Sequence, residues 1–266
     1  MNKKKKLELF LKNYWNSSSI NSGDTILLHS NAQRLLKECF ERDSKFNVKL
    51  ILSSLLKKIG SKGTLIVPTF TFQFIKKKFF DIKVTPSETG LISELVRKSK
   101  NSVRTGHPIY SFSVLGKNKK LFRNIDNKDA FSNESPFQIM HDLNCKIVIL
   151  DLPDSQCMTF YHHIEQMNNV KYRQTKFFLG RYKDQKNKIT KKFYTVFVRN
   201  LKKNIVTDVD RAGKYLWKNK VFTGDLPLLK SGIRVAKVKE VFKSISNIIK
   251  ANKAKKYLYS IKKVKN

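Results

Sequence analysis

The sequence is poor in cysteine, proline and glycine. Of its 266 residues only 3 are Cys, 6 are Pro and 10 are Gly. The cysteines, Cys39, Cys145 and Cys157, are odd in number and lack the spacing of metal ligands. This pattern argues against a disulfide framework and against a structural zinc site, so we expect reduced thiols and no metal.

Long apolar runs and linkers are also missing. No stretch approaches the roughly 20 uncharged apolar residues of a membrane span. The N-terminal MNKKKKLELFLKNYW mixes apolar residues with lysine and does not form the core of a signal peptide. Without a Pro/Ser-rich linker or a repeat, the simplest interpretation is a cytoplasmic protein with one domain over residues 1–266. We expect its Lys-rich termini to be mobile.

Acidic residues are scarce beside basic ones. The chain has 55 Lys and Arg but 20 Asp and Glu, which gives a formal net charge of +35. Such a charge is typical of proteins that bind polyanions, so a non-catalytic, basic polyanion-binding protein is one alternative. The lysines are spread along the whole chain, however, and no RNA-binding or helix-turn-helix motif organises them, so we expect no specific nucleic-acid partner. No pattern specifies an oligomeric state.

The apolar pattern predicts alternating strands and helices. Strands are predicted at 23–30, 64–70, 110–116, 145–152 and 191–200. Helices are predicted at the amphipathic N-terminus and at 48–59, 91–99, 158–167 and 238–250. Residues 182–192 are predicted to be a charged hairpin or loop. The order indicates an α/β fold, a single layered domain with a central mixed sheet flanked by helices.

Several segments carry a resemblance to a known family. GDTILLHSN, GTLIVPTFTF, VRTGHPIYSFSVLG and TFYHHIEQ occur in this order, with SPF between the last two. With PSETGLISELVRK and SGIRVAKVKEVF, they resemble the signature stretches of the aminoglycoside 3-N-acetyltransferase family, the antibiotic N-acetyltransferase type. The resemblance spans nearly the whole chain. It implies acetyl-coenzyme A (acetyl-CoA) as donor, a primary amine of an aminoglycoside or amino sugar as acceptor, and a fold distinct from the usual acetyltransferase fold.

The resemblance places a Thr-x-x-His-x-x-Glu motif on Thr159, His162 and Glu165. An alkylammonium is no nucleophile, so direct attack on a thioester needs a base, and an imidazole with a pKa near ~6.5 suits that role. We therefore predict His162 as the general base and Thr159 as a substrate-binding residue. Glu165, at i+3 on the same helical face, could orient the imidazole, stabilise the imidazolium or hold the substrate ammonium. We interpret the adjacent His163 as structural or solvent-facing.

Two strand ends carry candidate donor-binding residues. His29 and Ser30 end one buried strand, and Thr69 follows Pro68 at the end of another. In open α/β sheets ligands meet the strands at such ends. A hydroxyl or backbone N–H there could bind the thioester carbonyl or the pantetheine arm as an oxyanion donor. The alternative is a polar cap on each strand.

A further cluster surrounds a glycine turn. Arg104, His107 and Ser111 are predicted to bind the cofactor, because the fork of an arginine suits the phosphates of coenzyme A. A structural ion pair is the alternative for Arg104. The family usually has a second His where Tyr110 stands and a second Ser where Asn31 stands. We therefore assign Tyr110 to acceptor binding.

Two further alternatives concern mechanism and acceptor. Cys157 lies five residues before His162, so a thiol nucleophile with a covalent acyl-enzyme is a competing mechanism. The net charge favours an anionic acceptor, such as a nucleotide-linked amino sugar of surface polysaccharide synthesis. A polycationic aminoglycoside would need a locally acidic pocket, for which Asp151, Asp154 and Glu165 are candidates. Asp151 is therefore a predicted substrate-binding residue.

Overall fold

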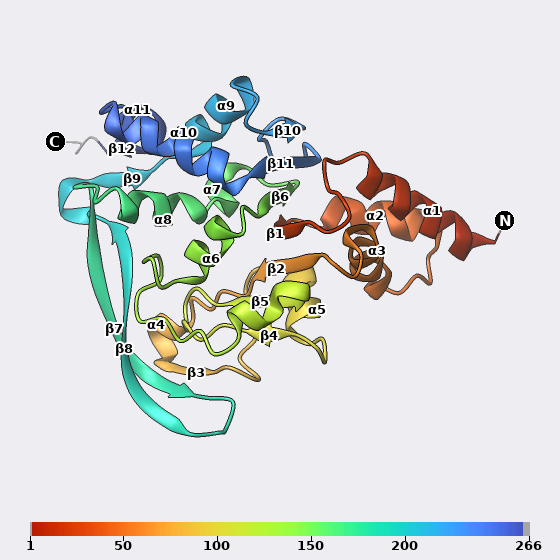
Figure 1. Ribbon diagram of the computed structural model, residues 1–266, viewed down its shortest axis with the longest axis horizontal. Coiled ribbons are helices and arrows are strands. Elements are labelled where there is room, and N and C mark those ends of the chain that lie inside the picture. The colour runs from red at the N-terminus through yellow and green to blue at the C-terminus, as the bar shows by residue number, and fades with distance from the viewer. Residues whose placement is uncertain (1, 263–266) are drawn as a thin grey trace.

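A computed structural model of the chain describes residues 2–262 (Figure 1). Its α-helices are α1 (Lys3–Asn16), α2 (Gln33–Arg42), α3 (Lys49–Ile59), α4 (Phe74–Lys77), α5 (Leu91–Arg97), α6 (Pro136–Asp142), α7 (Asp154–Cys157), α8 (Phe160–Met167), α9 (Asp210–Lys218), α10 (Val238–Lys250) and α11 (Ala254–Tyr257). Its strands are β1 (Thr25–Ser30), β2 (Thr64–Pro68), β3 (Phe79–Asp81), β4 (Val103–Arg104), β5 (Phe112–Gly116), β6 (Lys146–Leu150), β7 (Arg173–Lys183), β8 (Ile189–Arg199), β9 (Ile205–Thr207), β10 (Thr223–Gly224), β11 (Ile233–Lys237) and β12 (Tyr259–Ile261). Two 3₁₀ helices, η1 (Lys117–Phe122) and η2 (Leu201–Lys203), complete the chain.

A seven-stranded mixed sheet forms the centre of the molecule. Its strand order is β10-β11-β6-β1-β2-β5-β4. β1 runs parallel to both β6 and β2, whereas β11 and β5 run antiparallel to their neighbours. In the β1–β6 pair Ser30 lies opposite Leu150, so the carboxyl ends of the parallel strands meet at one edge. The predicted mixed sheet flanked by helices is confirmed.

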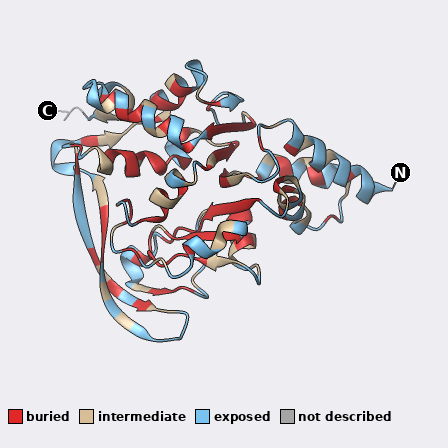
Figure 2. Ribbon diagram, viewed as in Figure 1, coloured by how far each residue is buried: buried red, intermediate tan, exposed pale blue. Residues whose placement is uncertain are grey.

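Both faces of the sheet are covered, which explains the uninterrupted apolar runs of its parallel strands. Because side chains alternate along a strand, Leu27, Ile66 and Ile147 belong to one buried cluster, which also takes residues of α6, α8 and α10. Ile26 and Leu65 belong to a second cluster, which takes residues of α1, α2, α3 and α5. Figure 2 shows the central strands buried between exposed outer helix faces.

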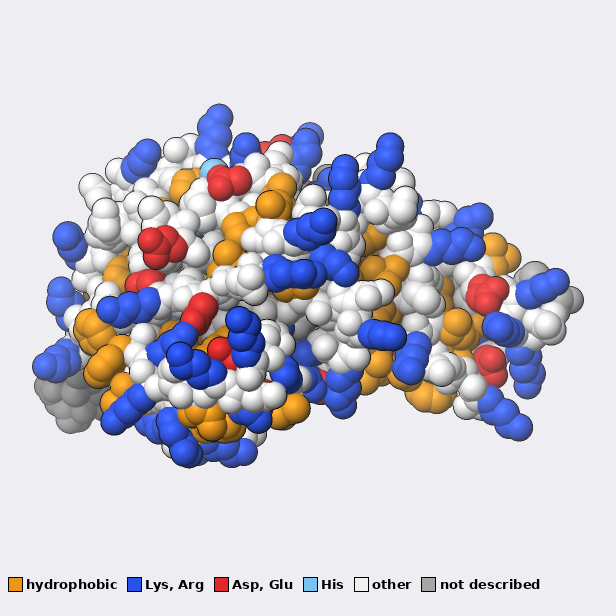
Figure 3. All heavy atoms as spheres, turned by 60° about the horizontal axis from the view of Figure 1, so that its bottom comes forward, with side chains coloured by type: hydrophobic (Ala, Val, Ile, Leu, Met, Phe, Trp, Pro, Cys, Tyr) orange, Lys and Arg blue, Asp and Glu red, His pale blue; other side chains and the backbone are white. Residues whose placement is uncertain are grey.

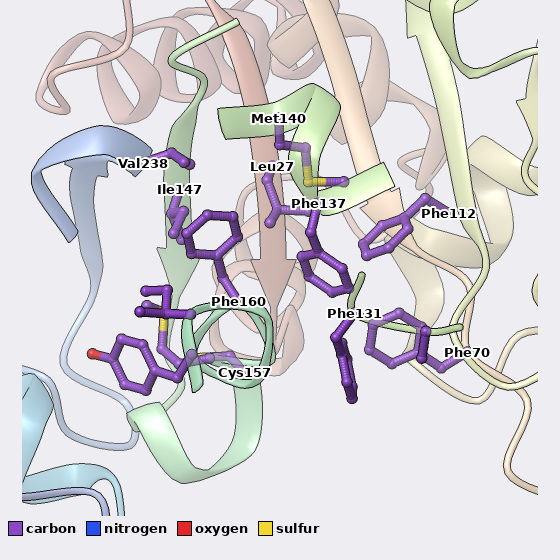
Figure 4. Packing of buried hydrophobic residues seen from close by; sticks show 14 of the residues in the cluster. Leu27, Phe70, Phe112, Phe131, Phe137, Met140, Ile147, Cys157, Phe160 and Val238 are labelled. Carbon is purple, nitrogen blue, oxygen red and sulfur yellow. The ribbon is translucent and has the colours of Figure 1, made fainter. Parts of the chain in front are cut away.

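Aromatic rings fill the side of the sheet that carries α8 (Figure 4). The ring of Phe112, on β5, lies 5.1 Å from that of Phe137 on α6, and Phe137 lies 5.5 Å from Phe131. The ring of Phe131 then meets the imidazole of His162 edge-on at 5.5 Å. The edge-to-face contacts Phe112–Phe137 and Phe131–His162 hold their rings in defined orientations, so this row of rings links the sheet to α8.

A long two-stranded arm extends from the body. β7 and β8 pair along their whole length, from Arg173 opposite Arg199 to Lys183 opposite Ile189. At its far end β7 pairs with β3 (Figure 1). The predicted charged hairpin at 182–192 is confirmed as the tip of this arm, where Lys183 pairs with Ile189, but the rest of β7 is a strand that the apolar pattern did not predict. The predicted strand at 191–200 is part of β8.

The N-terminal lysines belong to a helix. Asn2 caps α1 by accepting a hydrogen bond from the backbone of Lys5 at 2.9 Å, and Leu7, Leu11 and Trp15 are buried on the inner face. The prediction of mobile termini also covers residues 263–266, which lie outside the described residues. Within residues 2–262, none of the helices combines the length and apolarity that a membrane crossing requires.

Candidate functional site

A cleft of about 600 Å³ lies at the carboxyl ends of β1, β2 and β6. This is the edge where open α/β sheets bind ligands. Its lining includes four predicted site residues, which are His29, Ser30, Thr159 and His162. The structure thus brings together residues that are far apart in the sequence.

A second hollow, of about 770 Å³, lies between α1 and α3. It is lined by residues such as Leu9, Leu50 and Lys57 and by no predicted site residue. We place the site in the smaller cleft, because only that cleft combines a strand-end position with an imidazole backed by a carboxylate.

His162 and Glu165 meet on one face of α8, as their i, i+3 spacing predicts. Oε2 of Glu165 lies 2.8 Å from Nδ1 of His162. The imidazole side chain is 18% exposed, whereas that of Glu165 is 1% exposed. The carboxylate is therefore placed to orient the ring from inside the protein.

Two residues at the root of the β7–β8 arm hold Glu165 from the other side. The hydroxyl of Tyr172 donates to Oε1 of Glu165 at 2.9 Å, and Nε of Arg173 lies 2.6 Å from Oε2. Because both carboxylate oxygens are engaged inside the protein, Glu165 is not free to hold a substrate ammonium. The geometry therefore favours two of the predicted roles of Glu165, which are to orient the imidazole of His162 and to stabilise its imidazolium form.

The protonation states follow from burial and from Arg173. Burial lowers the pKa of His162, and the charge of Arg173 lowers it further, against the opposing effect of Glu165. Burial alone would raise the pKa of Glu165, but Arg173 and the hydrogen bonds from His162 and Tyr172 bring it below its ordinary value. At neutral pH the site therefore holds an ionised carboxylate beside a neutral imidazole, which is the form that can accept a proton.

Two polar atoms of the cleft are buried without a hydrogen-bond partner among the described residues. They are Nε2 of His29 and Oγ1 of Thr159. Burial and the nearby charge of Arg234 lower the pKa of His29 to about 3, so this imidazole is neutral. Since buried polar atoms normally have partners, these two atoms are candidates for ligand binding.

Cys157 also lines the cleft but is not poised as a nucleophile. It belongs to α7, whereas His162 belongs to α8, and its thiol donates to the carbonyl of Pro153 at 3.1 Å. Burial and the charge of Asp154 raise its pKa well above the ordinary value. Because the thiolate is the reactive form, this environment disfavours the acyl-enzyme mechanism.

A buried ion pair supports the cleft wall. Arg234 on β11 and Asp154 on α7 are joined at 2.6 Å, and the hydroxyl of Tyr161 donates to the same carboxylate at 2.5 Å. Gly213 on α9 leaves room for it, because an added Cβ would lie 2.4 Å from the carboxylate. Burial raises the pKa of Asp154 to about 6, although Arg234 opposes that rise.

The charge of the cleft differs from that of the surface. Figure 3 shows Lys and Arg scattered over the visible face. Among the described residues that line the cleft, none is Lys or Arg, and the acidic ones are Glu88 and Asp154. The charge of Asp154 is matched by Arg234, so Glu88 is left as the exposed carboxylate of the lining.

Three predicted cofactor residues lie behind the cleft wall instead. The guanidinium of Arg104 donates to the hydroxyl of Ser111 at 3.1 Å and to the carbonyl of Thr69 at 2.9 Å. Ser111 also donates to that carbonyl, and all three residues are buried outside the cleft lining. Their polar groups are satisfied by one another, which favours the structural alternative, and we leave them out of the proposed site.

His107 and Tyr110 likewise lie outside the lining. Nδ1 of His107 accepts from the backbone of Tyr110 at 3.1 Å, and its Nε2 lies 3.3 Å from the carbonyl of Thr195 on β8. Burial lowers the pKa of this imidazole to about 4. The ring of Tyr110 packs on Phe70 and Phe131. His107 therefore braces the body against the arm, and Tyr110 belongs to the row of aromatic rings beside it.

Asp151 is tied into the frame next to the cleft. Its Oδ1 pairs with Arg34 of α2 at 2.9 Å and accepts from the backbone of Gly232 at 2.8 Å. The side chain is buried and does not line the cleft. Asp151 therefore connects the end of β6 to α2 and to the start of β11. This structural role is favoured over contact with an acceptor.

His163 is structural. Its imidazole is buried and bonds through Nδ1 to the carbonyl of Phe131 at 2.8 Å. Over residues 2–262 no group of three or more His, Cys, Asp and Glu side chains is arranged to hold a metal ion.

Sequence reasoning missed Arg173 and Glu88. A buried glutamate needs a cationic partner. That requirement could have pointed to Arg173, which stands eight residues beyond Glu165. Glu88 stands within the segment PSETGLISELVRK, yet nothing in its spacing shows that it reaches the cleft. Arg173 lies on β7 and Glu88 lies in the segment before α5, and each reaches the site only through the fold.

The sequence and the fold of the chain match those of known proteins. A family model described as aminoglycoside 3-N-acetyltransferase matches residues 27–249. The chain is similar to the structure of aminoglycoside acetyltransferase AAC(3)-Xa, with a TM-score of 0.74 at 14% identity over 91% of this chain and 92% of the other. AAC-IIIb, solved in a binary complex with CoASH, gives 0.70 at 16% identity over 92% and 96%. AAC-VIa bound to sisomicin gives 0.72 at 13% identity over 92% and 97%. Curated protein sequences give no significant match.

Proposed function

Because this chain belongs to the aminoglycoside 3-N-acetyltransferase family and is therefore an acyltransferase, we propose that it transfers an acetyl group from acetyl-CoA to a primary amine of an aminoglycoside or amino sugar. Residues 1–266 act as one acetyltransferase domain. The observation that carries the proposal is the neutral imidazole of His162, which lies in the strand-end cleft with the ionised, buried Glu165 on its Nδ1 side.

The reaction is a direct attack on the thioester. The free amine attacks the carbonyl carbon while Nε2 of His162 takes the proton that the nitrogen loses. The tetrahedral intermediate then breaks its carbon–sulfur bond, and the imidazolium returns the proton to the leaving thiolate. The products are an amide and coenzyme A. Glu165 stabilises the imidazolium between these two proton transfers.

His29 and Thr159 supply hydrogen bonds in the cleft. Both polar atoms are buried and unpartnered among the described residues, so they can donate to the thioester oxygen as negative charge develops on it. Ser30 lies beside them in the lining and completes this donor side. Coenzyme A is supported as the donor by AAC-IIIb, a relative that binds CoASH.

The cleft favours a cationic acceptor over an anionic one. Its described lining lacks Lys and Arg and exposes Glu88, whereas the net charge of +35 belongs to the surface. A nucleotide-linked sugar would bring its phosphates to a carboxylate, which costs energy. AAC-VIa, a relative that binds sisomicin, supports an aminoglycoside-like amine. The anionic acceptor that the net charge suggested is thus disfavoured.

The test is a coupled assay of free thiol with acetyl-CoA and a panel of aminoglycosides, amino sugars and nucleotide-linked amino sugars. We expect His162→Ala to lower kcat/KM by ~10² to 10⁴-fold, the usual contribution of a general base. His141→Ala, at a partly exposed histidine on α6, is the matched control and should keep the parental rate. If the His162 variant retained activity within a factor of about three, His162 would not be the base.

A further inference from the structure

The β7–β8 arm has one buried face and one exposed face. Side chains alternate along a strand, and on β7 Phe178, Gly180 and Tyr182 are buried. Gly180 packs closely on the body, because an added Cβ would lie 2.4 Å from the ring of Phe74. The residues between these three point to the opposite side, at the edge of the molecule (Figure 1). The arm therefore has an outer face that the body does not cover.

This outer face carries large apolar side chains. Phe177 is 65% exposed, Phe193 is 58% exposed and Ile189 is 53% exposed. Leu179 lies opposite Phe193 in the register of the arm, so their side chains share the face. Neighbouring apolar side chains that stay uncovered indicate a surface that binds a partner.

Two cations share the face with these apolar residues. Arg181 lies opposite Lys191 in the register, and both side chains are exposed. Arg181 lies 5.4 Å over the ring of Phe79, and neither cation forms an ion pair within residues 2–262. Like charges directly opposite each other destabilise a pair of strands, so a bound anion would relieve a cost that the arm carries alone.

The charge of the whole arm has the same sign. β7 contains four Lys and Arg and β8 contains three, and neither strand contains Asp or Glu. Carboxylates of other elements pair with Lys183 and Lys192. The turn adds Lys186 and Lys188 and one carboxylate, Asp184, which accepts from the backbone of both lysines. The outer face and the turn thus form one apolar and cationic surface.

We propose that the outer face is a docking surface for a lipid bilayer with anionic headgroups. It consists of Phe177, Leu179, Arg181, Ile189, Lys191 and Phe193. The apolar side chains enter the boundary between headgroups and acyl chains, while the two cations stay at the level of the lipid phosphates. The chain binds the bilayer from its surface, and the backbone of the arm keeps its pairing.

The chemistry of the face distinguishes this partner from two others. A two-fold pair of copies through this face would bring the cations of both copies together. A single-stranded nucleic acid needs rings on which its bases stack, whereas Leu179 and Ile189 are aliphatic. An anionic bilayer offers an apolar layer beside its phosphates, so it suits both kinds of side chain.

The apolar part is tested by co-sedimentation of the whole chain with vesicles of phosphatidylglycerol and phosphatidylcholine, and with vesicles of phosphatidylcholine alone. We expect binding to the anionic vesicles that weakens with salt. Phe177→Ser with Phe193→Ser keeps the net charge and should weaken this binding by at least ~10-fold, because it removes apolar surface that the lipid buries. Leu228→Ser with Leu229→Ser, at exposed leucines between β10 and β11, is the matched control and should bind as the parent does.

The cations are tested by a second pair of variants. Arg181→Gln with Lys191→Gln should weaken binding to the anionic vesicles by ~25-fold, about 5-fold for each cation. Lys12→Gln with Lys57→Gln removes the same net charge from α1 and α3, which lie at the other end of the molecule (Figure 1). This control should weaken the binding by less than ~3-fold.

Several outcomes overturn the proposal. Absence of binding by the parent is one, and equal binding by the parent and a folded Phe177/Phe193 variant is another, since net charge alone would then hold the vesicles. A parent that sediments as a dimer, with that variant a monomer, would assign the face to a second copy. Weaker binding of a labelled oligouridylate by the variant, with unchanged vesicle binding, would assign it to nucleic acid. None of these measurements uses acetyl transfer, so they are independent of the proposed function.

Discussion

The guanidinium of Arg234 and the carboxylate of Asp154 form an ion pair of 2.6 Å, with side chains that are 1% and 0% exposed. Arg234 also donates to the carbonyl of Leu152 at 2.6 Å. The pair therefore fixes the segment between β6 and α8, which forms one wall of the cleft. Two charges taken out of water are stable only while each has the other.

Removing one partner of this pair should destabilise the protein strongly. We expect Arg234→Met to lower the free energy of unfolding by ~3 to 5 kcal/mol, because the buried carboxylate of Asp154 loses its counter-charge. Urea unfolding measures the loss. Arg211→Met is the control, since Arg211 pairs with Asp208 at the surface and such pairs contribute at most ~1 kcal/mol. An Arg234 variant as stable as the control would contradict this account.

Acid should destabilise the fold through its buried histidines. Burial lowers the pKa of His29 to about 3 and those of His107 and His163 to about 4. An unfolded imidazole, with a pKa near ~6.5, binds the proton that the folded one refuses, so this contribution is complete above ~6.5 and lost as the pH falls. Each group changes the free energy of unfolding by ~1.4 kcal/mol per pH unit in that window.

Urea unfolding at pH 7.5 and at pH 5.5 tests this dependence. We expect His163→Gln to reduce the pH dependence of the free energy of unfolding by the contribution of one titrating group, because its imidazole has a lowered pKa in the folded protein. Equal pH dependence in the parent and in the His163 variant would show that the buried imidazole is charged in the folded state.

The hydroxyl of Thr159 should matter for activity but not for stability. It stands at the N-terminus of α8 without capping the helix, and its Oγ1 is buried without a partner. We expect Thr159→Val, which has a similar shape, to leave the free energy of unfolding unchanged or raised. It should lower kcat/KM by ~3 to 10-fold, the usual value of one hydrogen bond. Thr159→Ser, which keeps the hydroxyl, should restore the rate, and a Ser variant as slow as the Val variant would refute the role.

Glu88 should select acceptors by charge. We expect Glu88→Gln to lower kcat/KM for a polycationic aminoglycoside by ~5-fold at low salt, because two unit charges in contact attract by ~1 kcal/mol in water. An amino sugar with one ammonium group should lose less, and salt should remove the difference. Glu134→Gln, at an exposed carboxylate outside the cleft lining, is the control. Equal effects of the two substitutions would exclude Glu88 from acceptor binding.

The sequence predicted the buried elements well and the exposed arm poorly. β1 and β6 are runs of Ile, Leu and Val that a sheet covered on both faces requires, and α8 places His162 and Glu165 on one face by its period. β7 was missed because Arg173–Lys183 carries basic residues among its apolar ones. Its stability comes from pairing with β8, which a local pattern cannot show.

The sequence predicted contacts of the candidate site only between residues that lie on the same element, such as His162 and Glu165 on α8. Thr69 was predicted to bind the donor because it follows a strand end, and Ser111 because it lies near the glycine turn with Arg104. The β2–β5 pair turns both residues toward Arg104 and away from the cleft. Arg173 and Glu88 reach the site from other elements, so the contacts that matter to them exist only after the chain has folded.

The uneven charge of the molecule has a consequence for the order in which products depart. Under the proposed function, acetylation turns an ammonium into a neutral amide, so Glu88 attracts the product less than it attracted the substrate. Coenzyme A keeps its phosphates after transfer and remains drawn to a surface rich in lysine. We expect the acetylated amine to leave first and coenzyme A last, with coenzyme A the stronger product inhibitor.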